Sequence, residues 1–221
     1  MRTIRLLILS DGPNELGSVL DEDLTPSSLP ALPNLVHRIS HGHANVTYCC
    51  RQFKSVRHAP GRGHKYAGKV KQAVRIAWEE EFDAVVIVVD RDRNHDSERI
   101  VPLRQGRDEM DAKPFPKCVV GMAIEAFDAW MVVDGKAVDA AGGDASRAHP
   151  DPEKLDGEEG TGRHPKDRAI ELFGSRSALT GAYAKAAAVV DLDLLEKCCQ
   201  KGFKPFADEV RERIAKPLLG V

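Results

Sequence analysis

The chain has 221 residues, of which 42% are hydrophobic and 30% are charged, and its formal net charge is -2. This composition is typical of a folded chain with a substantial core and excludes a long disordered protein. The longest strongly apolar run, 84–89, is far shorter than the roughly 20 residues of a membrane-spanning helix, so no membrane association is expected. The five cysteines show no C-x-x-C spacing, which predicts reduced thiols and a cytoplasmic location.

Hydrophobic patterning predicts alternating strands and helices in the first part of the chain. The apolar run from Thr3 to Ser10 predicts a strand rather than a signal peptide, because no small-residue cleavage pattern follows it. Residues 21–35 hold three prolines and are expected to form a loop, whereas residues 64–82 have the spacing of an amphipathic helix. Residues 84–90 are apolar on both faces, as in a central strand of a parallel sheet. Further strands are predicted at 45–52 and 117–123, and a helix at 124–133.

The last third of the chain has helical spacing. Residues 141–163 are rich in Gly, Asp and Glu and are expected to form a loop or linker. The order of elements predicts an α/β fold, a parallel sheet flanked by helices with a C-terminal helical extension. The expected domains are an α/β core at 1–140, the linker at 141–163 and a helical C-terminal subdomain at 164–221. Its predicted helices are 164–173, 182–190, 192–199 and 206–215.

Charge is distributed unevenly along the chain. Residues 24–78 contain nine Lys and Arg and no Asp or Glu, whereas the remainder is acidic on balance. Lys and Arg side chains release counterions when they neutralise phosphates, so this segment favours a nucleic-acid partner, with DNA preferred to RNA. The alternative is that the segment pairs with the acidic remainder of the protein. The candidate nucleic-acid-binding residues are Arg62, Lys65, Lys69, Lys71 and Arg75.

Carboxylates follow three of the predicted strands. In an open parallel sheet the carboxyl ends of the strands meet at one edge, which is where ligands bind. Carboxylates gathered there would repel one another unless a cation lies among them, and a hard ion with oxygen ligands is the natural choice. The expected cofactor is therefore Mg²⁺, or Mn²⁺ in its place. The candidate metal ligands are Asp11 and Glu15 after the first strand, Asp90 and Asp92 after 84–89, and Glu125 and Asp128 after 117–123.

Each acidic pair also has a structural interpretation when taken alone. Asp after a strand commonly caps the turn into a helix, and Glu15, Glu125 and Asp128 could be first-turn acids that interact with a helix dipole. The sequence His41-Gly42-His43 has no neighbouring acid or cysteine ligand and is expected in a solvated loop. Trp130 is expected in the core.

The acidic motifs resemble those of the TOPRIM superfamily of topoisomerases, bacterial primases, recombination factors and overcoming-lysogenization-defect nucleases. The matching segments are 9–15 (LSDGPNE) and 89–92 (VDRD). Over nearly its whole length the chain resembles an uncharacterised bacterial TOPRIM-like family related to these nucleases. That family has an acid two residues before a Trp, as in 128–134 (DAWMVVD). Shorter matches lie at 151–153, 165–166, 183–185 and 203–206.

The resemblance implies a TOPRIM-like sheet and a Mg²⁺-dependent nuclease that hydrolyses nucleic-acid phosphodiesters. It implies catalytic roles for Asp11, Glu15, Asp90, Asp92 and Asp128. The family usually has Glu where this chain has Asp11 and Asp128, so either Glu15 takes the first role, the metal geometry shifts, or activity is weakened.

The family also implies an ATPase partner in a phage-defence system, and the sequence leaves an oligomer open. An alternative function is a non-catalytic regulatory or binding module of TOPRIM fold that docks an ATPase partner. Two other interpretations of Asp90-x-Asp92 are a nucleotide-sugar transferase and a haloacid-dehalogenase-type phosphatase. The phosphatase is ranked last, because Arg93-Asn94 follow where Thr or Val is required.

Overall fold

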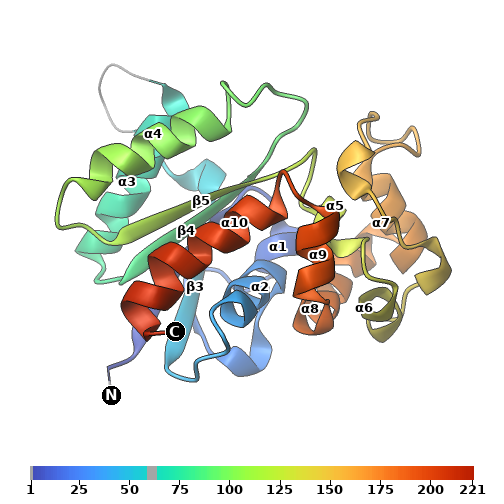
Figure 1. Ribbon diagram of the computed structural model, residues 1–221, viewed down its shortest axis with the longest axis horizontal. Helices are drawn as coiled ribbons and strands as arrows, with labels where there is room; N and C mark the ends of the chain where they lie inside the picture. The colour runs from blue at the N-terminus through green and yellow to red at the C-terminus, as the bar shows by residue number, and fades with distance from the viewer. Residues whose placement is uncertain (1, 59–63) are drawn as a thin grey trace.

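Within residues 2–58 and 64–221, which the computed structural model describes, five strands form one sheet between layers of helices (Figure 1). The strand order is β2-β3-β1-β4-β5, and all neighbours are parallel except β2 and β3. The predicted α/β class with a parallel sheet is therefore confirmed. The strands are β1 (Ile4–Ser10), β2 (Asp23–Leu24), β3 (Val46–Gln52), β4 (Ala84–Asp90) and β5 (Lys117–Ala123).

The central strands are buried on both faces. In β4 every residue from Ala84 to Val89 has no solvent-exposed surface, which is why this segment is apolar without alternation. Successive side chains of a strand point to opposite faces, so each strand contributes to two cores. Leu7 and Ile87 belong to one hydrophobic cluster, whereas Ile8 and Val86 belong to the other.

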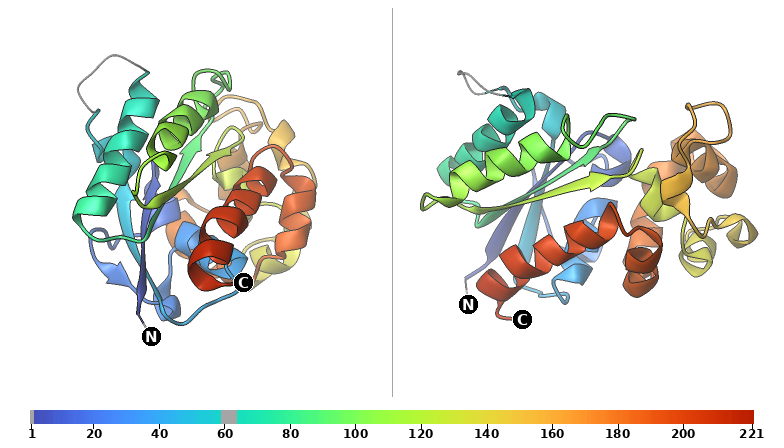
Figure 2. Two further views of the ribbon diagram at one scale, coloured as in Figure 1. Left: turned by 60° about the vertical axis from the view of Figure 1, so that its left-hand side comes forward. Right: turned by 45° about the horizontal axis from the view of Figure 1, so that its top comes forward.

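Helices cover both faces of the sheet (Figure 2). Helices α3 (Lys65–Glu79) and α4 (Ile100–Asp111) lie together on one face. Helices α2 (Ala31–Ile39) and α10 (Phe203–Val210) lie on the other face, and α8 (Leu179–Val189) packs against α2. The shorter helices are α1 (Pro13–Leu16), α5 (Asp128–Met131), α6 (Gly135–Ala140), α7 (Pro165–Phe173) and α9 (Leu192–Cys198), and a π-helix spans Arg211–Leu219.

Helices α5 to α9 gather beyond the carboxyl ends of the strands, at the right of Figure 1. The C-terminal helices share one hydrophobic cluster with the sheet. Trp130 is fully buried, as expected, and its ring centroid lies 5.2 Å from that of Phe203 and 5.5 Å from that of Phe206. These aromatic contacts join the chain after residue 164 to the α/β part. All five cysteines are free.

One predicted loop is partly helical, and one helix is not predicted by the sequence. The segment 21–35 is not all loop, because α2 begins at Ala31 and buries Leu32, Leu35 and Val36 at helical spacing. Its prolines did not prevent this, since Pro30 caps the helix and Pro33 lies in the first turn, where a missing N–H costs no hydrogen bond. The helix α4 was not predicted at all.

The predicted helix at 124–133 is also wrong at its start. Glu125 has a φ of +62°, and only Asp128–Met131 are helical. The reason is that this loop is bonded to the loop after β4: Asp92 N–H donates to the Glu125 carbonyl at 3.1 Å, and Phe127 N–H donates to the Asp90 Oδ1 at 2.8 Å. Glu125 and Asp128 therefore do not share a helical face.

The crossing of α3 and α4 depends on a glycine. A Cβ on Gly106 would lie 2.5 Å from the Ala67 carbonyl oxygen and 2.8 Å from its Cα, and backbone atoms cannot move aside. We expect Gly106→Ala to destabilise the protein by about 1–3 kcal/mol, despite the better helix propensity of Ala. The matched control is Gly181→Ala in α8, where a Cβ meets no atom within 4 Å, and we expect it to stabilise by up to about 1 kcal/mol. Urea denaturation checks both, and equal effects would contradict the packing argument.

Candidate functional site

The sheet has a topological switch point between β1 and β4. From β1 the chain crosses by α2 to β3 on one side, and from β3 it crosses by α3 to β4 on the other side of β1. The two crossovers lie on opposite faces, which leaves a crevice at the carboxyl ends of β1 and β4. Asp11 directly follows β1, and Asp90 is the last residue of β4. The structure thus brings two of the predicted residues to the place where ligands of such sheets bind.

Three carboxylates in this crevice act on one another. Glu15 and Asp128 each have only 5% of their surface exposed. Burial raises the pKa of Glu15 to about 7, and the negative charge of Asp128 adds to this effect. Burial likewise raises the pKa of Asp90 well above its usual range, with the charges of Glu15 and Asp128 contributing. Glu15, Asp90 and Asp128, which we call the buried acid group, therefore lie close enough together for the negative charge of one to disfavour the charged form of another.

Gly12 allows the Glu15 carboxylate to fold back over the backbone. A Cβ on Gly12 would lie 2.4 Å from Glu15 Oε2, although the φ of -106° at Gly12 suits any residue. A larger residue at position 12 would therefore displace the Glu15 carboxylate, which is the end of a flexible side chain, and would not strain the backbone. The Glu15 Oε2 atom is buried and has no hydrogen-bond partner within the described residues, an arrangement that is costly unless a ligand occupies it.

The other two members of the group are held by hydrogen bonds. Asp90 accepts from the Phe127 N–H, and Asp128 accepts from the hydroxyl of Tyr183 in α8. Tyr183 is fully buried, and burial together with the Asp128 charge raises its pKa well above the usual value. The sequence identified residues 183–185 only as a short family match. No spacing rule links position 183 to position 128, so the contact could not be found from the sequence.

Asp11 and Asp92 lie on the more exposed side of the crevice, next to cations. Burial raises the pKa of Asp11, while the charges of Arg99 and Lys69 oppose this rise. Arg99 forms an ion pair with Asp92 at 3.2 Å and donates to the hydroxyl of Tyr66. The Asp92 side chain remains 57% exposed. This side of the crevice thus presents both signs of charge.

Glu125 is placed differently from the other predicted ligands. Its carboxylate is buried, with one oxygen in an ion pair with Arg91 and the other accepting the Arg93 N–H at 3.1 Å. Both oxygens are therefore satisfied by the protein. The positive φ of Glu125 turns its side chain in this direction, away from the position that a continuous helix would give it.

The predicted nucleic-acid-binding residues fall into three classes. Lys69 is buried and donates to the carbonyl oxygens of Phe53 and Lys54, at 3.1 and 3.3 Å. Lys71 forms an ion pair with Glu109 at 2.8 Å, as the alternative interpretation expects. Lys65 and Arg75 are exposed and form no ion pair within the described part of the chain, whereas Arg62 lies outside the described residues.

His164 is a site residue that the sequence did not indicate. It caps α7, and its Nδ1 accepts the Lys166 N–H at 3.1 Å, which leaves Nε2 to carry the proton of the neutral ring. Burial lowers the pKa of His164, while the charges of Asp128 and Asp92 raise it. The imidazole is therefore near enough to the crevice to interact with both carboxylates. Its position follows from the packing of α7, which only the tertiary structure reveals.

The fit of a divalent ion was tested on these atoms. Within residues 2–58 and 64–221, no group of three or more Asp, Glu, His or Cys side chains is arranged to hold a metal ion. Mg²⁺ in proteins usually takes one or two carboxylates and completes its shell with water. The oxygen donors of the buried acid group, with the unpartnered Oε2 of Glu15 among them, fit that smaller requirement.

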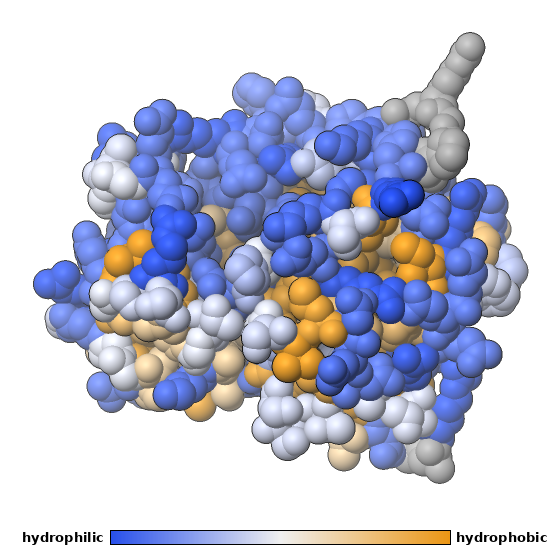
Figure 3. Space-filling view, turned by 180° about the vertical axis from the view of Figure 1, so that it is seen from behind, coloured by the Kyte–Doolittle hydropathy of each residue, from blue (hydrophilic) through white to orange (hydrophobic). Residues whose placement is uncertain are grey.

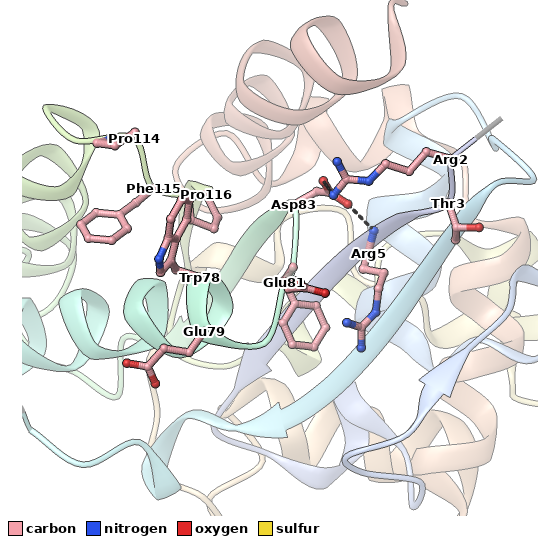
Figure 4. Close-up of a pocket in the computed structure, with 11 residues that line it drawn as sticks. Arg2, Thr3, Arg5, Trp78, Glu79, Glu81, Asp83, Pro114, Phe115 and Pro116 are labelled. Atoms are coloured by element: carbon pink, nitrogen blue, oxygen red, sulfur yellow. Dashed lines mark hydrogen bonds and ion pairs between the residues drawn. The ribbon is translucent and has the colours of Figure 1, made fainter.

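A different cavity lies at the opposite end of the sheet. It has a volume of about 950 Å³ and is lined by Trp78 and Phe115, whose rings meet edge to face, and by Asp83, which accepts the Arg5 N–H (Figure 4). These residues lie near the amino ends of β1 and β4, away from the carboxylates. The face of the molecule turned away in Figure 1 is mainly hydrophilic, with separate hydrophobic patches (Figure 3).

Comparisons with protein-family models, with curated proteins and with solved structures find no match to this chain. Among the described residues, none of the helices is both long and apolar enough to cross a bilayer.

The raised pKa of Glu15 predicts a pH dependence of stability. The folded state keeps this proton up to about pH 7, whereas the unfolded chain releases it near 4.5, so stability falls as pH rises between these values. The slope for one group is at most about 1.4 kcal/mol per pH unit, or on the order of 3 kcal/mol in total.

We expect Glu15→Gln to be more stable than the wild type above pH 7 and similar to it at pH 4.5. Urea titrations across this range, with the exposed Glu22→Gln as control, measure the difference. A Glu15→Gln curve parallel to the wild type would contradict the assignment.

The hydroxyl of Tyr183 is predicted to stabilise the buried Asp128. Tyr183→Phe leaves that carboxylate without its donor, which is expected to cost about 1–3 kcal/mol at neutral pH. A double-mutant cycle with Asp128→Ala by urea denaturation checks the pairing. If Tyr183→Phe costs as much in the Asp128→Ala background as in the wild type, the hydroxyl does not act through Asp128.

Proposed function

We propose that this chain is a Mg²⁺-dependent nuclease of TOPRIM-like fold that hydrolyses nucleic-acid phosphodiesters. The observation that carries the proposal is the buried acid group at the switch point, where burial and the charge of neighbouring carboxylates raise the pKa values of Glu15 and Asp90. Such repulsion is retained in a folded protein where a cation offsets it. Cations at the rim, in reach of Asp11, supply the complementary charge for a phosphate.

The proposed metal-holding residues are Asp90 and Glu15, with water completing the shell. When bound, the ion would neutralise phosphate charge and make a water more acidic for in-line attack. Asp128 would orient its neighbours through the Tyr183 hydroxyl rather than contact the phosphate. Arg99, positioned by Tyr66 and Asp92, would bind a non-bridging phosphate oxygen.

Glu15 supports one of the alternatives left open by the sequence. The first acid of this chain is Asp11, which is one methylene shorter than the Glu usual in the resembling family. Glu15 lies one turn further on, is buried, and keeps an unpartnered oxygen. We therefore assign to Glu15 the proton transfer that the longer first acid would perform, with Asp11 in a supporting electrostatic role.

Substitution of Asp90 tests the proposal. Asp90→Asn preserves the acceptor for the Phe127 N–H but removes the charge, so the fold is retained while the ion loses its ligand. We expect cleavage of plasmid and single-stranded DNA in Mg²⁺ to fall by about 100-fold or more, because misplacing one reacting group already costs that much. The matched control, the exposed Asp139→Asn in α6, is expected to cleave at the wild-type rate.

Calorimetric titration with Mg²⁺ gives an independent readout. Heat of binding is expected for the wild type and for Asp139→Asn, and none for Asp90→Asn. Absence of both cleavage and heat in the wild type would contradict the nuclease. That result would instead favour a non-catalytic TOPRIM-fold module that docks an ATPase partner.

A further inference from the structure

A second group of cations borders the acidic crevice. A cavity of about 420 Å³ opens between α4, the carboxyl half of β5 and the start of α10. Arg91 lines this cavity and directly follows Asp90 in the chain. In Figure 1 the strand β5 runs between α4 and α10, at the edge of the sheet.

The cavity carries an excess of positive charge. Arg104 and Lys201 line it, and neither side chain forms an ion pair within residues 2–58 and 64–221. Arg91 is balanced by Glu125, although its Nε has no hydrogen-bond partner among the described residues. Asp96 adds one carboxylate to the lining. Two uncompensated cations and one anion favour an anionic ligand.

The free edge of β5 supplies a backbone donor. Along an edge strand, the backbone N–H and C=O groups of successive residues alternately face the neighbouring strand and face outward. The Val120 N–H faces outward and donates to Glu209 at 3.0 Å, and the Cys118 carbonyl accepts from Arg213 at 2.7 Å. Met122 faces the same way as Val120 and lines the cavity. Its N–H therefore faces outward from the edge of the sheet, on the side where the cavity lies.

The remainder of the lining is apolar. A volume of about 420 Å³ lies within the range of small-molecule sites, about 300–1,000 Å³, and at its small end. An apolar floor beside cations suits a ligand with a flat apolar part and a phosphate. The apolar lining residues are Ile100, Val120, Met122, Ile124, Pro205 and Phe206.

We propose that this cavity binds one nucleoside phosphate unit, with the phosphate between Arg104, Lys201 and the Met122 N–H and the base or sugar against the apolar floor. This inference rests on the proposed function, since it assigns the unit to the substrate strand beside the phosphodiester that is cleaved. The site differs from the basic segment 24–78, because its cations come from the part of the chain that is acidic on balance.

Binding of a short fluorescein-labelled oligodeoxynucleotide in EDTA tests the site without cleavage. The test variant is Arg104→Gln with Lys201→Gln, and the matched control is Lys136→Gln with Lys185→Gln, which removes the same charge from exposed positions in α6 and α8. We expect the test variant to bind at least about tenfold more weakly at low salt. The slope of log affinity against log salt should decrease by about 0.7, because one phosphate contact on a single strand is lost. The control should bind as the wild type does.

A parallel titration with ATP separates the two sources of a nucleoside phosphate. If DNA is bound and cleaved but the test variant is unaffected, this site is refuted while the nuclease stands. If the wild type does not cleave DNA but binds ATP, and the test variant loses that binding, the site stands with a free nucleotide as its ligand and the nuclease is refuted. If the wild type binds neither probe, both proposals are refuted.

Discussion

Mutual repulsion among carboxylates is the constraint on which the structure at the carboxyl ends of β1 and β4 depends. Glu15 and Asp128 are buried and Asp90 is half-buried at the switch point between β1 and β4, and burial and neighbouring charge raise the pKa values of Glu15 and Asp90. Folding alone does not favour such a group, because each charge loses hydration without gaining a protein cation. The surrounding structure must hold the carboxylates in place.

That support comes from contacts between loops and from one distant helix. The loop after β5 is bonded to the loop after β4 through Asp90 and Phe127, and α8 brings Tyr183 to Asp128. The aromatic contacts of Trp130 with Phe203 and Phe206 fix the α5 region against α10. The C-terminal helices therefore hold the loops that carry these carboxylates in place, and they also complete the hydrophobic core.

Charge segregation along the chain is not the same as charge segregation in space. Of the basic segment 24–78, Arg51 pairs with Asp21 and Glu80, and Lys71 pairs with Glu109. Lys69 is used to satisfy backbone carbonyls beside the crevice. In contrast, Arg104 and Lys201 come from the part of the chain that is acidic on balance, and both line one cavity. Neither side chain forms an ion pair within residues 2–58 and 64–221. A count along the chain therefore overstates the free positive charge of the segment 24–78 and misses the two cations that line this cavity.

Local patterns determined much of this protein by themselves. Three of the four parallel strands, β1, β4 and β5, are evident as short apolar runs, because a strand buried on both faces cannot tolerate polar side chains. Acids follow these three strands at the edge of the sheet that the sequence predicts. The helices α2 and α4 were missed, because prolines and mixed polarity obscure their spacing.

Tertiary structure alone decided which acids act on one another. A turn with positive φ at Glu125 orients its side chain toward Arg91. Asp128 accepts a hydrogen bond from Tyr183, 55 residues later in the chain, and the packing of α7 places His164 near the crevice. Contacts across such separations leave no periodic trace in the sequence, since they depend on how whole elements pack rather than on the residues nearby.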